Sequence, residues 1–567
     1  MIPTIDTDVL VIGGGGAGAR AALSAAESGA RVVLALKGVL GSSGATAYRV
    51  SSVGGFQAAT GAVDPDDTPE EHVNDIMRAA QGMCSERLAR IVATEAPDAL
   101  RDLIARGVEL STENDRPVIS TGCFASRPRM HWIVGHGHSI MNVLKPEIAA
   151  RGVDVRERVI GTSLLVADGA CAGATLLDRQ GHLVAVRAGA TVLCTGGAAR
   201  LFTPSLVPPE ITGDGYALAF RAGAVLANLE YIQYGFGVIH PITHLLSAHL
   251  WCLWPDMRNG NGESFLSAYL PRGLTAEDCA SARATHYPFS SRGAERFIDI
   301  AADTELLAGR GTARGGVLLD FRDASARIAH VPPAVGLRWQ YLRQTLGQHS
   351  LDPEKSPVEI SVFGHAFNGG VLIDESGRST LEGLYAAGEA AAGPHGADRL
   401  GGNMLMTSQV FGRRAGRAAA REAMSARCRG IDTVAVEAEG KRLAAMHRPE
   451  APHRLGELLT RLREGMRGVR IVRDEKSLQS GLDAVAEGEA ALATARIAGP
   501  GDVQHALELE NLLLVARLVT SAALARRESR GSHYRSDFPE RDDRVWRRSI
   551  LFRSADGRME QTTRVLC

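Results

Sequence analysis

The sequence has few cysteines, no closely spaced cysteine pair and no long apolar run. Its eight cysteines, at positions 84, 123, 171, 194, 252, 279, 428 and 567, include no CxxC or similar pair. This argues against a zinc site or an iron–sulfur cluster held by this chain alone, so we expect no metal. No run of 18 apolar residues occurs, and we expect no membrane span. The opening residues do not resemble a signal peptide, and we expect a cytoplasmic protein with reduced thiols.

An excess of charge of one sign is also missing, because the formal net charge is -1. Nothing therefore points to nucleic acid or to another polyanion as a partner. The sequence is long and rich in glycine: it has 567 residues, 45% of them hydrophobic, and 63 glycines. The length predicts several domains. Many of the glycines lie in short clusters inside apolar runs, which suits backbone that packs against a cofactor.

The first such cluster predicts a dinucleotide-binding loop. Gly13, Gly15 and Gly18 form a GxGxxG pattern after an apolar run at residues 8–12 and before an alanine-rich helical segment. The first glycine permits the tight turn, the second permits close approach of a pyrophosphate, and the third permits close packing of helix on strand. The helix N-terminus then offers free N–H groups to the phosphates. A second strand follows at residues 31–36, which completes a βαβ unit.

Two later glycine segments favour FAD over NAD. The second strand ends in Leu36 and Lys37, where an NAD-binding unit usually has an acidic residue for the ribose. Further strand-and-glycine segments occur at 190–199 and 383–391, and TGDG follows at 212–215. Such additional contacts are what an elongated FAD requires.

The order of these segments predicts an interrupted α/β fold. We expect a doubly wound, Rossmann-like FAD-binding domain over residues 1–230 and 357–429, with an α+β capping domain inserted at 231–356. A helical domain follows at 430–567, because residues 506–529 repeat apolar side chains at helical spacing. We expect the active site where the cap closes over the flavin and excludes water.

Six segments resemble the succinate dehydrogenase/fumarate reductase flavoprotein family, which includes L-aspartate oxidase. They are VIGGGGAGARAA (11–22), SVGGFQAATG (52–61), TGDGYALAFRAGA (212–224), EYIQY (230–234), GLYAAGEAAAGPHGADRLGGNML (383–405) and ESRGSHYRSDFPERDD (528–543). The resemblance extends over nearly the whole chain.

The cofactor contacts follow in part from the motifs and in part from the resemblance. The predicted FAD-binding residues are Gly13, Gly15, Gly16, Ala17, Gly18, Lys37, Ser43, Thr46, Gly54, Gly55, Thr195, Gly196, Gly197, Asp214, Glu389, Asn403 and Leu405. Many relatives attach FAD to a histidine just before the segment that contains Gly54. The matching position here falls on or next to Tyr48, and no histidine lies between residues 40 and 70. The resemblance therefore implies non-covalent FAD.

The resemblance also implies a hydride transfer between flavin N5 and a carbon adjacent to a carboxylate. It assigns the proton transfer to Arg292 and the binding of one carboxylate to His365 and Arg399. Arginine offers a planar fork of donors to a carboxylate, and histidine adds a further donor. Arg283, His286 and Arg296 lie close to Arg292 in sequence, and a shift of a few residues would give its role to one of them.

One departure predicts an altered substrate. Relatives that act on dicarboxylates have a histidine and a threonine where this chain has Gly235 and Gly237. We expect simple C4 dicarboxylates to be poor substrates and expect room for a bulkier group lined by Phe236, Trp251 and Trp254. The alternative is that His240 or His244 takes over the lost role.

Three classes of function remain open on the sequence alone. The first is an enzyme that acts on a small carboxylated substrate. The second is a flavoprotein subunit that relays electrons to a separate iron–sulfur partner. The third, a flavin-binding scaffold without activity, is disfavoured because it would not require Arg292, His365 and Arg399 together. A homo-oligomer is neither indicated nor excluded.

Overall fold

The computed structural model describes residues 2–48, 54–425 and 429–566, and a seven-stranded sheet lies at its centre. The strand order is β8-β2-β1-β11-β10-β9, and β19 also pairs with β11. Pairing is parallel from β8 through β11 to β19, and antiparallel among β9, β10 and β11. The strands are β1 (Thr4–Ile12), β2 (Val32–Leu36), β8 (Asp154–Glu157), β9 (Val159–Ala167), β10 (Ala170–Asp178), β11 (Leu183–Leu193) and β19 (Leu384–Ala386).

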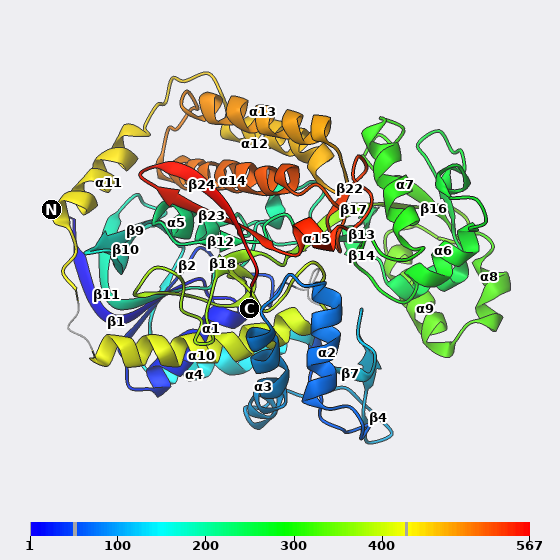
Figure 1. Ribbon diagram of the computed structural model, residues 1–567, viewed down its shortest axis with the longest axis horizontal. Helices are drawn as coiled ribbons and strands as arrows, with labels where there is room; N and C mark the ends of the chain where they lie inside the picture. Colours follow the sequence, from blue (N-terminus) through cyan, green and yellow to red (C-terminus); the bar gives the residue numbers. More distant parts are fainter. Residues whose placement is uncertain (1, 49–53, 426–428, 567) are drawn as a thin grey trace.

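Helix α1 (Gly16–Glu27) follows β1 as the glycine pattern predicted, and it packs against α4 (His136–Ala150) and α10 (Asn403–Ser425) (Figure 1). The third glycine of the pattern allows the helix to lie this close to the loop. A Cβ atom at Gly18 would lie 1.7 Å from the carbonyl oxygen of Gly13. Any side chain here would push α1 away from the sheet and displace its N-terminus from the cavity described below.

The inserted cap is built on a separate five-stranded antiparallel sheet in the order β14-β13-β17-β16-β15. Its strands are β13 (Ile232–His240), β14 (His244–Leu245), β15 (Asp256–Arg258), β16 (Val317–Asp320) and β17 (Val358–Phe367), and its longer helices are α6 (Ala276–Arg283), α7 (Arg296–Leu307) and α9 (Pro333–Gly347). Strand β17 pairs with β13 and β16, so this sheet extends to Phe367 rather than ending at residue 356. The apolar alternation of β17 gave no sign of which sheet it joins, because long-range pairing decides that.

The C-terminal part packs α12 (Leu455–Gly465), α13 (Glu475–Leu492) and α14 (Pro500–Ala525) together, and α11 (Thr433–Ala445) precedes them (Figure 1). It is not helical to its end. Strands β23 (Ser549–Ala555) and β24 (Arg558–Arg564) form a hairpin that joins a second five-stranded sheet with β12 (Leu226–Ala227), β18 (Gly370–Leu372) and β20 (Ala391–Ala392). The mixed α/β fold class predicted from the sequence is confirmed, and the hairpin is an addition to it.

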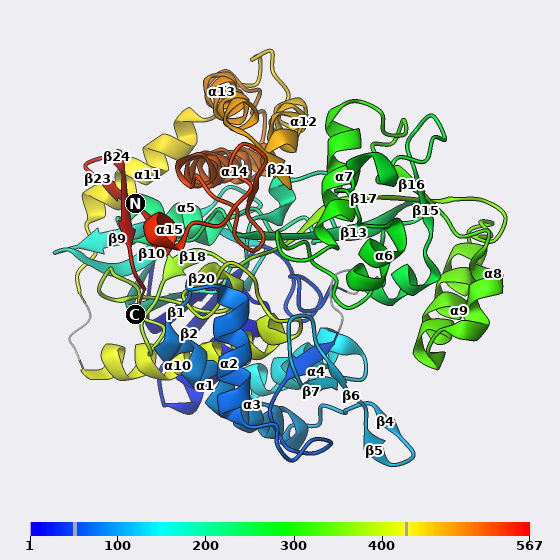
Figure 2. The ribbon, with the colours of Figure 1, turned by 45° about the vertical axis from the view of Figure 1, so that its right-hand side comes forward.

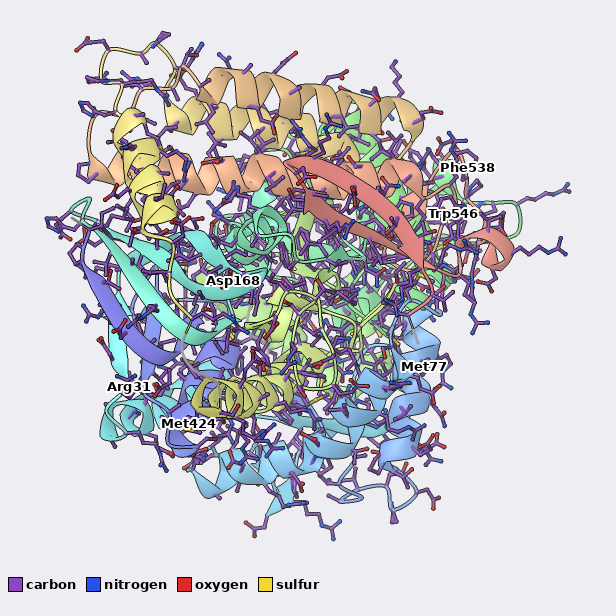
Figure 3. The ribbon with its side chains drawn as sticks, turned by 60° about the vertical axis from the view of Figure 1, so that its left-hand side comes forward. Arg31, Met77, Asp168, Met424, Phe538 and Trp546 are labelled. Carbon is purple, nitrogen blue, oxygen red and sulfur yellow. The ribbon has the colours of Figure 1, made fainter. Side chains whose placement is uncertain are left out.

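A fully buried charge network joins α14 to the start of the cap. Arg526 donates to Glu230 at 2.7 Å and to Glu528 at 2.9 Å, and Arg530 donates to Glu528 at 2.7 Å. All four side chains are 0% exposed. The Arg526 guanidinium also stacks on Trp546, which Figure 3 shows near Phe538 on the C-terminal segment.

We predict that Arg526→Met lowers the free energy of unfolding by about 3–5 kcal/mol, because it leaves Glu230 without its cation in a dry interior. Arg553→Met is the matched control. It removes an exposed pair with Glu560, whose partners are 56% and 44% exposed, and should cost less than about 1 kcal/mol. Urea unfolding measures both variants. Equal losses would show that the buried network adds nothing to stability.

Candidate active site

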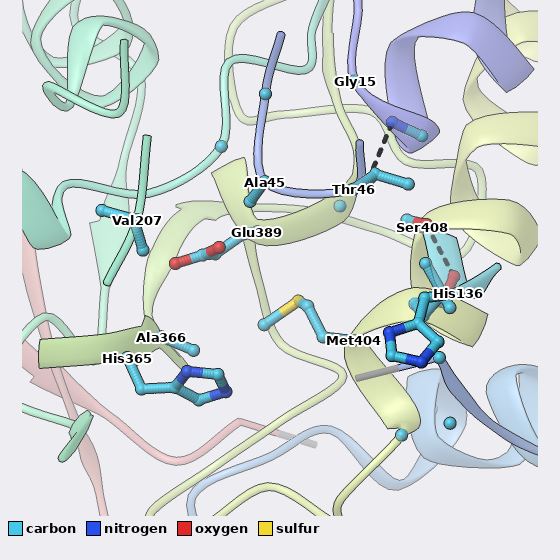
Figure 4. Close-up of a pocket in the computed structure, with 18 of the residues that line it drawn as sticks. Gly15, Ala45, Thr46, His136, Val207, His365, Ala366, Glu389, Met404 and Ser408 are labelled. Carbon is cyan, nitrogen blue, oxygen red and sulfur yellow. Dashed lines mark hydrogen bonds between the residues drawn. The ribbon is translucent and has the colours of Figure 1, made fainter. Parts of the chain in front are cut away.

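The N-terminus of α1 opens toward a long cavity, whose lining includes Gly13, Gly15 and Gly16. Gly15 occupies the N-cap position without a side-chain cap, and a Cβ atom there would meet nothing within 4 Å. The Gly16 N–H donates to Thr46 Oγ1 at 3.2 Å (Figure 4). Uncapped N–H groups and the helix dipole together favour an anion such as a pyrophosphate.

The cavity has a volume of about 800 Å³ and extends from the glycine loop past Glu389 to His365 and Arg399. Most of the predicted FAD-binding residues line it: Gly13, Gly15, Gly16, Ala17, Lys37, Ser43, Thr46, Gly54, Gly55, Thr195, Gly196, Asp214, Glu389 and Leu405. Its elongated course brings segments far apart in sequence to one ligand-sized space, as a dinucleotide requires.

Glu389 presents a buried carboxylate to the middle of this cavity. It lies in the short 3₁₀ turn Gly388–Ala390 after β19, and its Oε1 accepts the Phe367 N–H at 3.0 Å. Burial raises the pKa of Glu389 to about 7. Figure 4 shows this carboxylate and the His365 imidazole directed toward the cavity, with Met404 between Glu389 and His136. A buried carboxylate with unused acceptor positions suits the hydroxyl groups of a ribose. Together with the uncapped helix and the long cavity, it fits FAD.

Five predicted cofactor residues have other partners than a ligand. Lys37 pairs with Asp214 at 2.8 Å and with Glu508 at 3.1 Å, so Lys37 and Asp214 line the cavity but neutralise each other. Gly18, Gly197 and Asn403 are absent from the lining. Asn403 starts α10, and its Oδ1 instead accepts from His72 Nε2 at 3.1 Å. Gly18 and Gly197 serve packing, since a Cβ at Gly197 would lie 2.2 Å from Glu389 Oε1.

Arg399 places a buried positive charge at the inner end of the cavity. Its Nε donates to Gln233 Oε1 at 2.9 Å and its Nη1 donates to the Leu400 carbonyl at 2.9 Å. Its Nη2 has no hydrogen-bond partner in the described part of the chain. Burial lowers the pKa of Arg399, which stays a cation. A guanidinium fixed on two sides, with one nitrogen unused, is ready to accept a carboxylate.

His365 supplies a neutral donor beside this cation. Burial, followed by repulsion from Arg399, lowers the pKa of His365 to about 3. Its Nδ1 is buried and has no partner within residues 2–48, 54–425 and 429–566. The Tyr287 ring packs edge-on against the imidazole, with centroids 5.5 Å apart. The structure therefore brings His365 and Arg399 together as the resemblance implied.

Arg292 does not line the cavity. Its Nη2 donates to Asp398 Oδ2 at 3.0 Å, and its guanidinium stacks on Phe124 at 4.9 Å. Of the three neighbours considered as alternatives, only His286 lines the cavity; its Nε2 lies 3.0 Å from Glu295 Oε1. Arg283 is buried in a pair with Asp299, and Arg296 donates to the Ser291 carbonyl. The proton-transfer role of Arg292 stays a prediction.

The expected room at Gly235 and Gly237 is filled, which corrects the sequence-based expectation. A Cβ atom at Gly235 would lie 2.4 Å from the Tyr287 ring, and one at Gly237 would lie 2.6 Å from the Phe363 ring. Tyr287 also donates to the Phe236 carbonyl at 3.1 Å. Two aromatic rings therefore occupy the space that the missing side chains would have required.

The aromatic residues expected around that space lie elsewhere. Phe236 and Trp251 pack on each other in the cap core, and Trp254 is 43% exposed. None of the three lines the cavity. Of the two histidines considered as replacements, His244 lines it and His240 does not.

Several lining residues were not found from the sequence. They include Cys123, Met130, Trp132, His136, His249, Tyr287, Arg338, Tyr341, Met404 and Ser408. Half of them lie in a loop or on the cap, where no local pattern marks them. Only Met404 and Ser408 follow a recognisable motif closely enough to have been proposed.

Neither a metal cluster nor a membrane-spanning helix occurs among the described residues. No group of three or more His, Cys, Asp or Glu residues could hold a metal ion. None of the helices combines the length and the apolar character needed to cross a bilayer.

Comparisons with known proteins agree with this cavity. A family model described as FAD binding domain matches residues 8–405, and another described as Fumarate reductase flavoprotein C-term matches residues 460–565. Fold, cavity and match define an FAD-dependent oxidoreductase. Tyr48, on or next to which the position of the covalent histidine was predicted to fall, is not among the lining residues, and the positions that follow it, 49–53, lie outside the described residues.

Three similar proteins indicate which family of FAD-dependent oxidoreductases includes this chain. The fumarate reductase (CoM/CoB) of Methanothermobacter marburgensis has a subunit that is 37% identical, covering 96% of this chain and 97% of its own. L-aspartate oxidase of Streptomyces coelicolor is 32% identical over 97% and 92%. The structure of Mycobacterium smegmatis Sdh1 in complex with UQ1 superposes with a TM-score of 0.87 at 31% identity, covering 100% and 95%. The chain belongs to the succinate dehydrogenase/fumarate reductase flavoprotein family.

We predict that Glu389→Gln removes a pH dependence of the flavin-free protein. The native pKa of about 7 lies above the ordinary value of 4.5, so the native state holds a proton between these values that the unfolded state has lost. Stability of the wild type should therefore fall by about 3 kcal/mol as pH rises through this window. Urea unfolding at pH 4.5 and 8 measures the difference, which the glutamine variant should lack.

The same variant should bind FAD about 10–100-fold more weakly, because a charged acceptor is replaced by a neutral one. Flavin fluorescence titration measures this. If the free energy of unfolding of the wild type and of the variant depended on pH in the same way, and the FAD affinity were unchanged, Glu389 would contribute neither to the pH dependence of stability nor to FAD binding.

Proposed function

We propose that this oxidoreductase transfers a hydride between flavin N5 and a carbon adjacent to a substrate carboxylate, and that its substrate is larger than a simple C4 dicarboxylate. The observation that carries the proposal is the buried Arg399 guanidinium, which donates to Gln233 and to the Leu400 carbonyl and lies beside neutral His365, whose Nδ1 has no partner in the described part of the chain. Bound FAD would supply the two-electron chemistry. Non-covalent FAD is part of the proposal, supported by the absence of a histidine at residues 40–70.

We assign each residue a role according to its position in the cavity. Arg399 and His365 would bind and orient the carboxylate, while the Tyr287 ring, packed on His365, would keep water from that end of the cavity. Proton transfer is assigned to the segment 285–292, with Arg292 as the candidate from family resemblance and His286 as the alternative that lines the cavity. Asp398 would hold Arg292, since it accepts from Arg292, Ser290 and Gln81.

The surroundings of Gly235 and Gly237 disfavour a short dicarboxylate as the substrate. A short dicarboxylate bound at Arg399 would need donors near Gly235 and Gly237, and aromatic rings occupy that space. An unpaired carboxylate there would face a desolvation cost of several kcal/mol.

A second candidate function is a flavoprotein subunit of a fumarate reductase-like complex that passes electrons to a separate iron–sulfur partner. The 37% identical relative is itself one subunit of a fumarate reductase, which favours this candidate. In that case His244, which lines the cavity, would supply the second carboxylate contact. Purification distinguishes the two, because an active single chain favours an independent enzyme.

We predict that fumarate and succinate give kcat/KM values at least about 100-fold below those of larger enoic or amino acids, from the missing second contact. Stopped-flow reduction and reoxidation of the bound flavin measures the panel in both directions. A value for fumarate or succinate of about 10⁴ M⁻¹s⁻¹ or more would contradict the proposal and support the second candidate.

We predict that Arg399→Leu raises the KM of the best acid by about 100-fold or more, since it leaves the substrate carboxylate buried without its cation. FAD content should not change. Arg399→Lys is the matched control: it keeps the charge but loses the planar fork, and should fall between the leucine variant and wild type. An unchanged KM in the leucine variant would place carboxylate binding elsewhere.

A further inference from the structure

The cavity continues beyond Arg399 and His365 into an outer compartment between the cap and the FAD-binding domain. Ser120 and Trp132 line it from the FAD-binding side, and Leu245, His249, Arg338 and Tyr341 line it from the cap. Trp132 ends β7 (Pro128–Trp132), and Arg338 and Tyr341 lie on α9. Figure 2 shows α9 at the outer edge of the cap, to the right of the strands around β7. Tyr341 is 55% exposed, so this compartment forms the mouth of the cavity.

Arg338 is a cation without a carboxylate partner at this mouth. Its guanidinium lies 5.8 Å from the centre of the Trp132 ring, and it forms no ion pair within the described residues. Arg343, further along the same helix, pairs with Glu354 at 3.0 Å. The carboxylates among the lining residues are Glu210, Asp214 and Glu389. None of the three forms an ion pair with Arg338 among the described residues: Asp214 pairs with Lys37, and Glu389 lies in the middle of the cavity, where it packs against Gly197.

The wall between the two arginines is mostly apolar. Leu245, Leu246, Leu250 and Leu342 line it together with the aromatic Trp132 and Tyr341. His249 adds a polar group near Arg338 that stays neutral, because burial and then the Arg338 charge lower its pKa. A ligand that fills this space has an apolar or aromatic body between two cationic ends.

We propose that the outer compartment binds a second anionic group of the substrate, held by Arg338, at the far end of an apolar or aromatic body whose carboxylate contacts Arg399. This inference rests on the proposed function and names its substrate class: elongated acids with a carboxylate, sulfonate or phosphate at the distal end. The contact to a second carboxylate, which relatives make at the positions of Gly235 and Gly237, would then be made by Arg338 at the mouth of the cavity. Arginine suits such groups because its planar fork matches their oxygens.

The experiment compares matched ligands that differ only in the distal charge. The probes are trans-cinnamate against 4-carboxycinnamate, and trans-2-octenoate against trans-2-octenedioate, each titrated into the FAD-loaded protein. The readout is the change in flavin absorbance, which requires no turnover. We expect the distal carboxylate to tighten binding about tenfold in at least one pair, and this gain to shrink as salt rises.

Variants identify the residue responsible. Arg338→Gln should abolish the preference for the distal carboxylate and leave the Kd of the monoacid within about twofold. Arg343→Gln is the matched control on the same helix and should change neither. Equal binding of both members of each pair, a preference that survives Arg338→Gln, or no flavin response to any probe would overturn the inference.

Turnover separates this inference from the proposed function. If the diacid binds through Arg338 but neither reduces nor reoxidises the flavin, the proposed reaction is wrong while the binding site stands. If the acids turn over with rates indifferent to Arg338→Gln and to the distal charge, the reaction stands and the outer site is refuted.

Discussion

Burial of the Arg399 guanidinium without a carboxylate partner costs free energy that its neighbours offset only in part. Gln233 and the Leu400 carbonyl each accept one hydrogen bond, but neither carries a negative charge. The neighbouring imidazole of His365 is neutral, and burial raises the pKa of the Cys123 thiol, so neither carries a charge that balances Arg399. Glu389 favours the charged form of Arg399 but forms no ion pair with it among the described residues. The molecule thus keeps a cation without an ion-pair partner in the wall of a deep cavity, and an anionic ligand would complete it. The cap, through Gln233 and His365, and the 388–405 segment meet at this point, whereas the glycine loop lies at the nucleotide end of the cavity.

The sequence revealed the parts of the site that depend on neighbours close in the chain. The glycine pattern predicted β1, the turn and α1, because strand, loop and helix lie within about thirty residues. Arg399 was proposed because it lies within the long segment 383–405, and His365 was proposed from the family resemblance; both line the cavity. Asn403 was wrong as a cavity residue, since its amide is used by His72, which lies 331 positions away. Lys37 was only partly right, because its charge is satisfied by Asp214 and Glu508.

The failures share one physical cause, which is packing between distant segments. Glycine at position 235 suggested empty space, yet Tyr287, an aromatic residue of the cap, fills it. The histidine- and tryptophan-rich segment suggested a subsite, yet Phe236 and Trp251 face the cap core and His244 faces the cavity. The terminal hairpin is an exception: β23 and β24 pair with each other across the turn at Asp556 and Gly557, a local hairpin signal, and β23 pairs in addition with residues 226–227. The other pairings leave no local trace in composition or periodicity.

The side chain of Gln233 has a consequence for how the two domains communicate. This residue belongs to cap strand β13, and its amide both accepts from the Arg399 side chain and donates to the Arg399 carbonyl at 3.0 Å. The orientation of the inner cation is therefore a property of the closed cap and of the FAD-binding domain jointly. If the cap has to be closed to orient Arg399 for an anion, thermodynamic linkage requires that an anion bound to Arg399 stabilises the closed cap. Binding of an anion at Arg399 and closure of the cap are therefore coupled through the side-chain amide of Gln233.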